Sequence, residues 1–339
     1  MKIMIDILHP AHVHFFRNFI KKMEQKGHKI LVTTRKKDIA LNLLDIYGIR
    51  YIKLSELKPG FFNLLVELIK RNIKFYKIAK QFKPDVIMGL MGPTVATAGL
   101  FLKCKKIVFW DTENSKLSNL VVYPLVDYVC TPSCYEANVW GNHITYPGYH
   151  ELAYLHPKRF KPNSRILKKY GLKKGERYFI VRFVSWGTYH ERNEAGFMDK
   201  VGFVKKLEKY GRVFITSETS LPKELEKNRI NIPYDKLHDF LAFSSMYIGE
   251  SATIASEAAI LGIPAIYVST SRRGYTNEEE RRYGLVYNFS NQKQALKKAI
   301  ELLGRKATKK EWQRRKNKML SEKVDVTDWL IKFVNKVVK

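Results

Sequence analysis

The segment from Gly249 to Pro264 constrains the fold of this chain most. A short apolar run ends at Gly249, small residues follow, and an alanine-rich stretch continues as far as Gly262. Gly262 is expected to end a helix in a left-handed conformation, and Pro264 prevents its continuation. The apolar run at 265–268 then predicts a buried strand. Strand, tight turn, helix and strand together form one unit of a parallel sheet.

The turn between that first strand and the helix predicts an anion site. Backbone N–H groups at Ala252 to Ile254 would point out of the helix N-terminus, where the helix dipole also favours negative charge. Glu257 follows Thr253 by four residues, so it is expected one turn deeper on the same face, where it could accept hydrogen bonds from a ribose diol. We therefore predict a diphosphate seat that includes Glu250 and Ser251. The alternative is an ordinary strand-to-helix turn whose small residues only allow close packing.

Alternating strands and helices extend over most of the chain and predict an α/β fold with two Rossmann-like, doubly wound parallel sheets. A segment rich in Pro, Gly, His and Tyr at 146–164 marks the connection between them. We expect a first domain at 1–150, a second at 151–325, and a last helix at 326–339 that could return to the first domain. The two halves are expected to face each other across a cleft, with ligands beyond the carboxyl ends of the strands.

The charge of the chain implies an anionic partner. Its 61 Lys and Arg residues outnumber 32 Asp and Glu residues, which gives a net charge of +29. A nucleotide, a phospholipid surface and a nucleic acid all fit this charge. The odd number of cysteines (Cys104, Cys130, Cys134) and the expected lack of a secretory leader favour a reducing cytoplasm. No apolar run reaches the roughly 18 residues that a transmembrane helix needs.

The stretch from Phe61 to Lys83 combines apolar residues with many basic ones and a single acid, Glu67. Such a helix could lie on an anionic membrane, and the acceptor of a reaction could then be carried on a lipid. A core-packed helix with a solvated basic face is the alternative.

Several segments resemble the GT-B glycosyltransferase superfamily. His9-Pro10-Ala11-His12-Val13-His14-Phe15, with the helix and strand that follow, looks like the first loop of inverting nucleotide-sugar glycosyltransferases. Residues 88–94 (Met-Gly-Leu-Met-Gly-Pro-Thr) are similar to the glycine-rich acceptor loop of the lipid-linked N-acetylglucosaminyltransferase of peptidoglycan synthesis, and 109–114 sits where that enzyme has a His-Glu-Gln-Asn segment. The resemblance implies a GT-B fold, a catalytic His12, a ribose-binding Glu257, and acceptor contacts from Gly89, Gly92, Thr94 and Asn114.

A second resemblance points to UDP-N-acetylglucosamine 2-epimerases, which share this fold. His190-Glu191-Arg192-Asn193 resembles their His-Arg-Arg-Glu-Asn segment, so His190 is a catalytic candidate. Asp111 and Glu113 could then stand for the acid and base of an epimerase. The chain departs from both relatives: Ala11 replaces a usual glycine, and the run Glu-Ala-Gly-Leu-Arg is missing after Glu113.

Inverting sugar transfer needs a base for the acceptor hydroxyl and a site that stabilises the departing nucleoside diphosphate. We predict His12 as that base, with Asp111 or Glu113 fixing its tautomer; loop and helix-capping roles are the alternatives. Further contacts are expected at the carboxyl ends of strands in the second half. There Arg182 and Ser185 would bind phosphate, and Ser217 and Glu218 the base or ribose. The resemblance to GT-B proteins implies that Arg272, Arg273, Asn277 and Glu278 contact the transferred sugar.

These observations lead to one main hypothesis and two alternatives. The chain is expected to be a cytoplasmic, metal-independent GT-B glycosyltransferase that uses a UDP-sugar, needs no other cofactor, and works on an unknown acceptor. That acceptor could be lipid-linked, and the protein could then work at the inner face of the cell membrane. No metal-binding Asp-x-Asp pair is present. The first alternative is a 2-epimerase-like isomerase. The second is a non-catalytic module that binds an anionic surface or nucleic acid, although no nucleic-acid-binding motif supports it. The oligomeric state stays open.

Overall fold

The computed structural model describes residues 1–36, 38–56, 61–184, 196–305 and 308–338. The chain forms two compact units, one of Met1–Tyr154 with Val324–Lys339 and the other of Leu155–Lys323. These divisions fall near the expected positions at 150 and 325. That the two halves face each other across a cleft stays a prediction.

The first unit is built on a seven-stranded parallel sheet with the order β3-β2-β1-β4-β5-β6-β7. Helices α1, α2 and α14 pack together on one face, and α3, α4 and α5 on the other, because the strand order reverses after β3. Its strands are β1 Lys2–Ile7, β2 Lys29–Lys36, β3 Tyr51–Glu56, β4 Val86–Leu90, β5 Lys105–Phe109, β6 Tyr128–Pro132 and β7 His143–Tyr146. Its helices are α1 Pro10–Gln25, α2 Asp38–Ile46, α3 Phe61–Phe82, α4 Pro93–Gly99, α5 Lys116–Val122, the 3-10 turn Tyr123–Leu125, and α14 Val326–Val337. The short helix α6 Leu152–Leu155 lies where the chain passes to the second unit.

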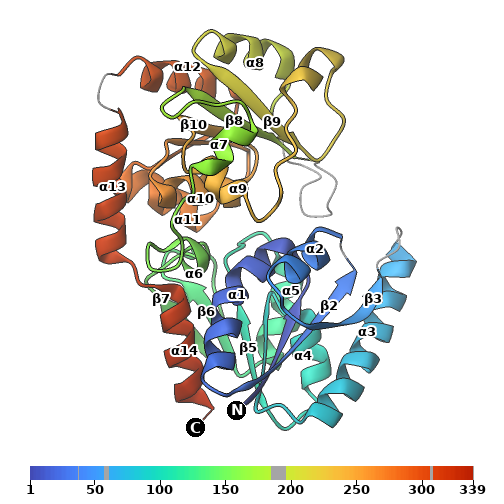
Figure 1. Cartoon of the computed structure of the whole chain (residues 1–339). Helices are drawn as coiled ribbons and strands as arrows, with labels where there is room; N and C mark the ends of the chain where they lie inside the picture. Colours follow the sequence, from blue (N-terminus) through green and yellow to red (C-terminus); the bar gives the residue numbers. More distant parts are fainter. Residues whose placement is uncertain (37, 57–60, 185–195, 306–307, 339) are drawn as a thin grey trace. The chain divides into compact units, whose positions relative to one another are not determined.

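The last helix completes the first unit. Figure 1 shows α14 (red) beside α1 (blue) on one side of the first sheet. The buried Thr327 hydroxyl donates to the carbonyl of Ala153 at 2.7 Å, and the amide of Asn18 on α1 donates to the same carbonyl at 2.9 Å. Two elements distant in sequence are therefore joined through one backbone oxygen, and the C-terminal segment is an integral part of this unit.

The second unit has a five-stranded parallel sheet with the order β12-β11-β10-β8-β9. The chain starts at β8, moves to β9, and returns to the other side of β8, so the strand order switches between β8 and β10. Its strands are β8 Tyr178–Phe183, β9 Arg212–Ser217, β10 Met246–Gly249, β11 Ala265–Val268 and β12 Val286–Phe289. Its helices are α7 Arg165–Lys169, α8 Lys200–Glu208, the 3-10 turn Lys223–Asn228, α9 Leu237–Leu241, α10 Ala252–Leu261, α11 Gly274–Glu278, the π-helical turn Glu279–Tyr283, α12 Gln292–Leu303 and α13 Thr308–Glu322.

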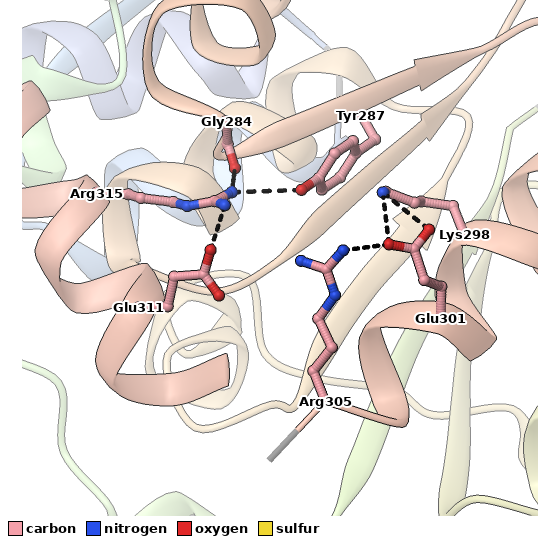
Figure 2. Close-up of polar contacts among 7 residues, drawn as sticks. All are labelled: Gly284, Tyr287, Lys298, Glu301, Arg305, Glu311 and Arg315. Carbon is pink, nitrogen blue, oxygen red and sulfur yellow. Dashed lines mark hydrogen bonds and ion pairs between the residues drawn. The ribbon is translucent and has the colours of Figure 1, made fainter. Parts of the chain in front are cut away.

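The guanidinium of Arg315 helps to hold the basic helix α13 on this second unit (Figure 2). Arg315 donates to the carbonyl of Gly284 and to the hydroxyl of Tyr287, 3.3 Å away, and it pairs with Glu311 on its own helix. Trp312, the residue after Glu311, is fully buried. Part of the positive charge of α13 is thus used inside the unit.

A buried carboxyl group lies beneath helix α10. Glu279 is fully buried, and its side chain accepts a hydrogen bond from the Ser256 hydroxyl of α10 at 2.7 Å. Burial is the largest cause that raises the pKa of Glu279 from 4.5 to about 8, and the neighbouring Glu278 acts in the same direction. Near neutral pH this carboxyl is therefore mostly protonated.

Replacing Glu279 should change how stability depends on pH. The folded chain holds a proton that the unfolded chain releases above about pH 4.5, so the free energy of unfolding falls as the pH rises from about 4.5 to 8. Glu279→Gln cannot titrate, so we expect a flatter profile and a stability at pH 8 that exceeds the wild-type value by up to a few kcal/mol. Urea unfolding at several pH values measures this, with the exposed Glu224→Gln as control. Parallel profiles for Glu279→Gln and wild type would contradict it.

Candidate functional site

Three titratable side chains gather at the carboxyl ends of the strands in the first unit. His12 lies in the first turn of α1 after β1, Asp111 follows β5, and His150 follows β7. Asp111 Oδ2 lies 2.9 Å from His150 Nδ1. Asp111 also influences the pKa of His12, so the three groups form one electrostatic cluster. His150 was not predicted, because its segment reads as an irregular linker.

The tautomer of His12 follows from one backbone contact. The N–H of Leu8 donates to His12 Nδ1 at 3.3 Å. An Nδ1 atom that accepts this bond carries no proton, so the neutral ring carries its proton on Nε2 and is a donor there. Burial is the largest cause that lowers the pKa of His12 well below its usual range, and His9 is the second. The ring is therefore neutral near pH 7.

This arrangement differs from that of a histidine base, and the predicted role of His12 as the base stays a prediction. A histidine that removes a proton through Nε2 needs its proton on Nδ1, usually directed at a carboxylate. His12 has the opposite tautomer, and Asp111 Oδ2 lies against His150 Nδ1. In this tautomer Nε2 of His12 is a hydrogen-bond donor.

The carboxylate of Asp111 is partly exposed and accepts a hydrogen bond. Its side chain is 22% exposed, and its other carboxylate oxygen accepts a hydrogen bond from the Thr112 hydroxyl at 3.1 Å. Ser115 occupies the N-cap position of α5 without a capping hydrogen bond from its side chain, so neither Asp111 nor Glu113 is the N-cap residue. Glu113 accepts from the backbone N–H of Glu136 at 3.4 Å, and Asn114 is exposed.

Position Gly92 in the predicted acceptor loop serves packing. Gly92 is the N-cap of α4 with φ +44°, and a Cβ atom there would lie 2.5 Å from Val108 Cγ1. Gly89 is buried inside strand β4, and Thr94 is fully buried. All three residues are buried, and their predicted contacts with an acceptor stay predictions. Met91, just before Gly92, has a φ of +56°, an uncommon conformation for a residue with a side chain.

Substitution at Gly92 tests this packing. Gly92→Ala introduces a methyl group against the β-branched Val108 as well as left-handed strain, so we expect a loss of about 3 kcal/mol in the free energy of unfolding. Gly48→Ala is the matched control, because Gly48 also has a positive φ (+65°) but no atom within 4 Å of its Cβ position; it should lose only about 1 kcal/mol. Chemical denaturation measures both, and equal losses would show that Val108 does not crowd this position.

In the second unit, the predicted diphosphate seat has the expected backbone. Helix α10 runs from Ala252 to Leu261, with Ser251 as its N-cap and Gly262 in the left-handed conformation at its end. Ser251 Oγ accepts the N–H of Ile254 at 3.4 Å. The N–H groups of Ala252 and Thr253 have no acceptor within the described part of the chain. Within the described residues, two of the three predicted amide donors thus have no acceptor, while the N–H of Ile254 has one.

Arg182 lies next to this helix N-terminus. It is level with Gly249 in the pairing of β8 with β10, so it borders the seat at the point where the strand order switches. Its guanidinium donates to Glu218 at 2.6 Å, and Ser217 accepts the N–H of Thr219 at 3.2 Å. Three predicted nucleotide contacts, Arg182, Ser217 and Glu218, therefore lie at the ends of adjacent strands.

Two predicted carboxylates have partners inside the protein. Glu250 is buried and accepts the N–H groups of Val184 and Phe197 at 2.9 and 2.8 Å. Glu257 is buried against His238, with 2.9 Å between Oε1 and Nε2. A nucleotide contact from either stays a prediction. Predicted residues Ser185 and His190 lie outside the described residues.

The loop after β11 holds the residues expected to contact the sugar. Arg272 is exposed, and Arg273 donates to Ser271 Oγ at 3.0 Å. Asn277 is buried in α11, and Glu278 pairs with Lys323 at 2.6 Å. Among the described residues, no group of three His, Cys, Asp or Glu side chains could hold a metal ion. Independence from metal stays a prediction.

The structural class of the chain follows from its two parallel sheets and from a comparison with solved structures. The structure of a UDP-GlcNAc 2-epimerase from Neisseria meningitidis bound to UDP-GlcNAc is similar with a TM-score of 0.68 and 12% identity, covering 99% of this chain and 100% of that one. Glycosyltransferase SsfS6 of Streptomyces sp. SF2575, complexed with thymidine diphosphate, has a TM-score of 0.63 and 11% identity, covering 98% and 99%. The chain therefore has the GT-B fold, which glycosyltransferases and 2-epimerases share.

The family follows from the sequence over almost its whole length. A family model described as "Protein of unknown function (DUF354)" matches residues 1–338, and the chain belongs to this family. Uncharacterized protein MJ0665 of Methanocaldococcus jannaschii is 25% identical over 280 residues, which cover 78% of this chain and 81% of that protein.

Proposed function

We propose that this protein is a glycosyltransferase that binds a UDP-sugar through its second unit and transfers the sugar to an acceptor bound by the first. The observation that carries the proposal is the pair of N–H groups at Ala252 and Thr253, next to Arg182 at the switch point of a parallel sheet. Helix N-termini and guanidinium groups at such points suit a diphosphate. Similar structures were solved with UDP-GlcNAc or thymidine diphosphate, which supports this ligand class.

The proposed chemistry divides between the two units. The acceptor hydroxyl gives its proton to the Asp111 carboxylate, and its oxygen bonds to the anomeric carbon of the sugar. The bond from that carbon to the diphosphate oxygen breaks, and its electron pair leaves with the nucleoside diphosphate. The amino end of α10 and Arg182 stabilise this charge in place of a metal ion. His12 donates from Nε2 to orient a substrate oxygen, while His150 holds Asp111.

A second candidate is a UDP-N-acetylglucosamine 2-epimerase-like isomerase. Asp111, His12 and His150 supply both proton-accepting and proton-donating groups within one cluster. Isomerisation of a nucleotide-sugar by such groups requires no second, acceptor substrate. The similarity to the Neisseria meningitidis epimerase supports this candidate equally at the level of fold. Incubation with UDP-GlcNAc alone separates the two, because only an isomerase converts it.

The acceptor is proposed to be carried on a lipid, with the protein working in the cytoplasm at the inner face of the cell membrane. The exposed basic and apolar side chains of α3 support this proposal.

Nucleotide binding by the second unit can be measured directly. UDP at 100 times its dissociation constant should stabilise the protein by about 2.7 kcal/mol. Arg182→Gln should weaken UDP binding roughly tenfold or more, because a charge-assisted contact with phosphate is lost. Arg212→Gln is the matched control: this exposed arginine lies at the start of β9 and pairs with Glu176. Isothermal titration calorimetry reads both variants, and equal affinities would remove Arg182 from the site.

Substitutions can distinguish hydrogen-bond donation by His12 from general-base catalysis. The side-chain amide of Gln places an N–H near the position of Nε2 but cannot take up a proton at pH 7. With a donor and acceptor that give turnover, His12→Ala should lower kcat by roughly 100-fold and Asp111→Asn by 100- to 10,000-fold, whereas His12→Gln should keep kcat within about tenfold of wild type. If His12→Gln is as inactive as His12→Ala, His12 is the base after all.

A further inference from the structure

We infer that the outer face of α3, together with the loop after α4, docks onto an anionic lipid bilayer. Its apolar part is a stripe along the helix. Ile69 and Ile73 are both 52% exposed, and Tyr76 continues the stripe at helical spacing. The ring of Tyr76 meets that of Phe101 edge-on at 6.2 Å. Phe101, in the loop after α4, is 75% exposed, so the stripe continues from one element to the next.

Lysines surround this stripe, and the acidic group of the helix is withdrawn from it. Exposed lysines of α3 lie one residue beyond each isoleucine and near the ring of Tyr76: Lys70, Lys74, Lys77 and Lys80. Glu67, the single acid of α3, is 6% exposed and accepts a hydrogen bond from the Ser55 hydroxyl. Arg71 is also buried, where it pairs with Asp6. The outer face of α3 therefore carries only positive charge.

An exposed apolar stripe flanked by lysines is stabilised more by an anionic membrane surface than by water. An interfacial helix buries a row of large apolar side chains at the level of the headgroups, while flanking lysines attract anionic lipids. Among the described helices, none has the length and apolar content that spanning a bilayer requires. The aromatic Phe101 and the isoleucines would enter the interface, and the lysines would remain at the headgroups.

The location of the face suits the proposed function. Helix α3 packs against β3 and α4, and both belong to the unit that holds the His12 and Asp111 cluster. A lipid-linked acceptor would then meet the unit that we propose to bind it. This biological purpose rests on the proposed function, but the binding of lipid does not.

Vesicle sedimentation tests the surface with the full chain. We expect binding to vesicles that contain phosphatidylglycerol and little binding to pure phosphatidylcholine. Ile73→Ser with Phe101→Ser, and separately Lys70→Gln with Lys77→Gln, should each weaken binding about tenfold or more. The control is Lys293→Gln with Lys297→Gln on α12, which removes the same charge from exposed lysines four residues apart in the second unit. The control should bind as wild type does.

Three results would overturn this inference. They are failure of the wild type to bind anionic vesicles, an equal loss of binding in the α12 control, and unchanged binding in both α3 variants. Light scattering tests whether a second copy of the chain binds this face instead. If the wild type is a dimer and the variant with Ile73→Ser and Phe101→Ser is a monomer, the face is a dimer interface. The UDP-induced thermal shift of each variant shows that it is folded, and it separates failure of the membrane surface from failure of the nucleotide site.

Discussion

All candidate groups of both units depend on one constraint, namely that parallel strands end at the same edge of their sheet. In the first unit this edge brings together His12 after β1, Asp111 after β5 and His150 after β7. In the second it places Arg182 beside the start of α10. The connecting helices begin at this edge, so their unsatisfied N–H groups also lie there. Polar chemistry gathers at these edges because the central strands of each sheet are buried and mainly apolar.

Buried acids in this protein are held by donors from the backbone or from neutral side chains as well as by cations. Glu250 accepts two backbone N–H groups, and Glu279 accepts a serine hydroxyl. Asp6 has both kinds of partner, the guanidinium of Arg71 and the hydroxyl of Thr33. A carboxylate that leaves water must recover its lost hydrogen bonds or take up a proton. Glu250 has hydrogen bonds from two backbone N–H groups, whereas the raised pKa of Glu279 favours uptake of a proton.

Local patterns in the sequence were sufficient for the α10 unit but not for the pairing of distant residues. Small residues after β10 and the glycine at 262 predict both ends of α10, because capping depends on neighbours within a few positions. The partner of Asp111 could not be found in this way. His150 follows β7, a four-residue strand without a strong apolar pattern, and only the sheet order brings it near β5. Likewise, the packing role of Gly92 depends on Val108 from the next strand.

The two most basic helices of the chain show why net charge alone does not locate a binding surface. On α13, the guanidinium of Arg315 donates to a backbone carbonyl and a tyrosine hydroxyl and pairs with a glutamate, so its charge has partners within the fold (Figure 2). On α3 the buried Arg71 is matched by Asp6, and the exposed lysines stand beside apolar side chains that also face water. Positive charge without nearby acids attracts anions, and an adjacent apolar stripe adds a reason to leave water. Of these two helices, α3 combines exposed lysines with an exposed apolar stripe. The side chains around the basic residues therefore distinguish a surface that suits lipid from a basic helix that packs on a core.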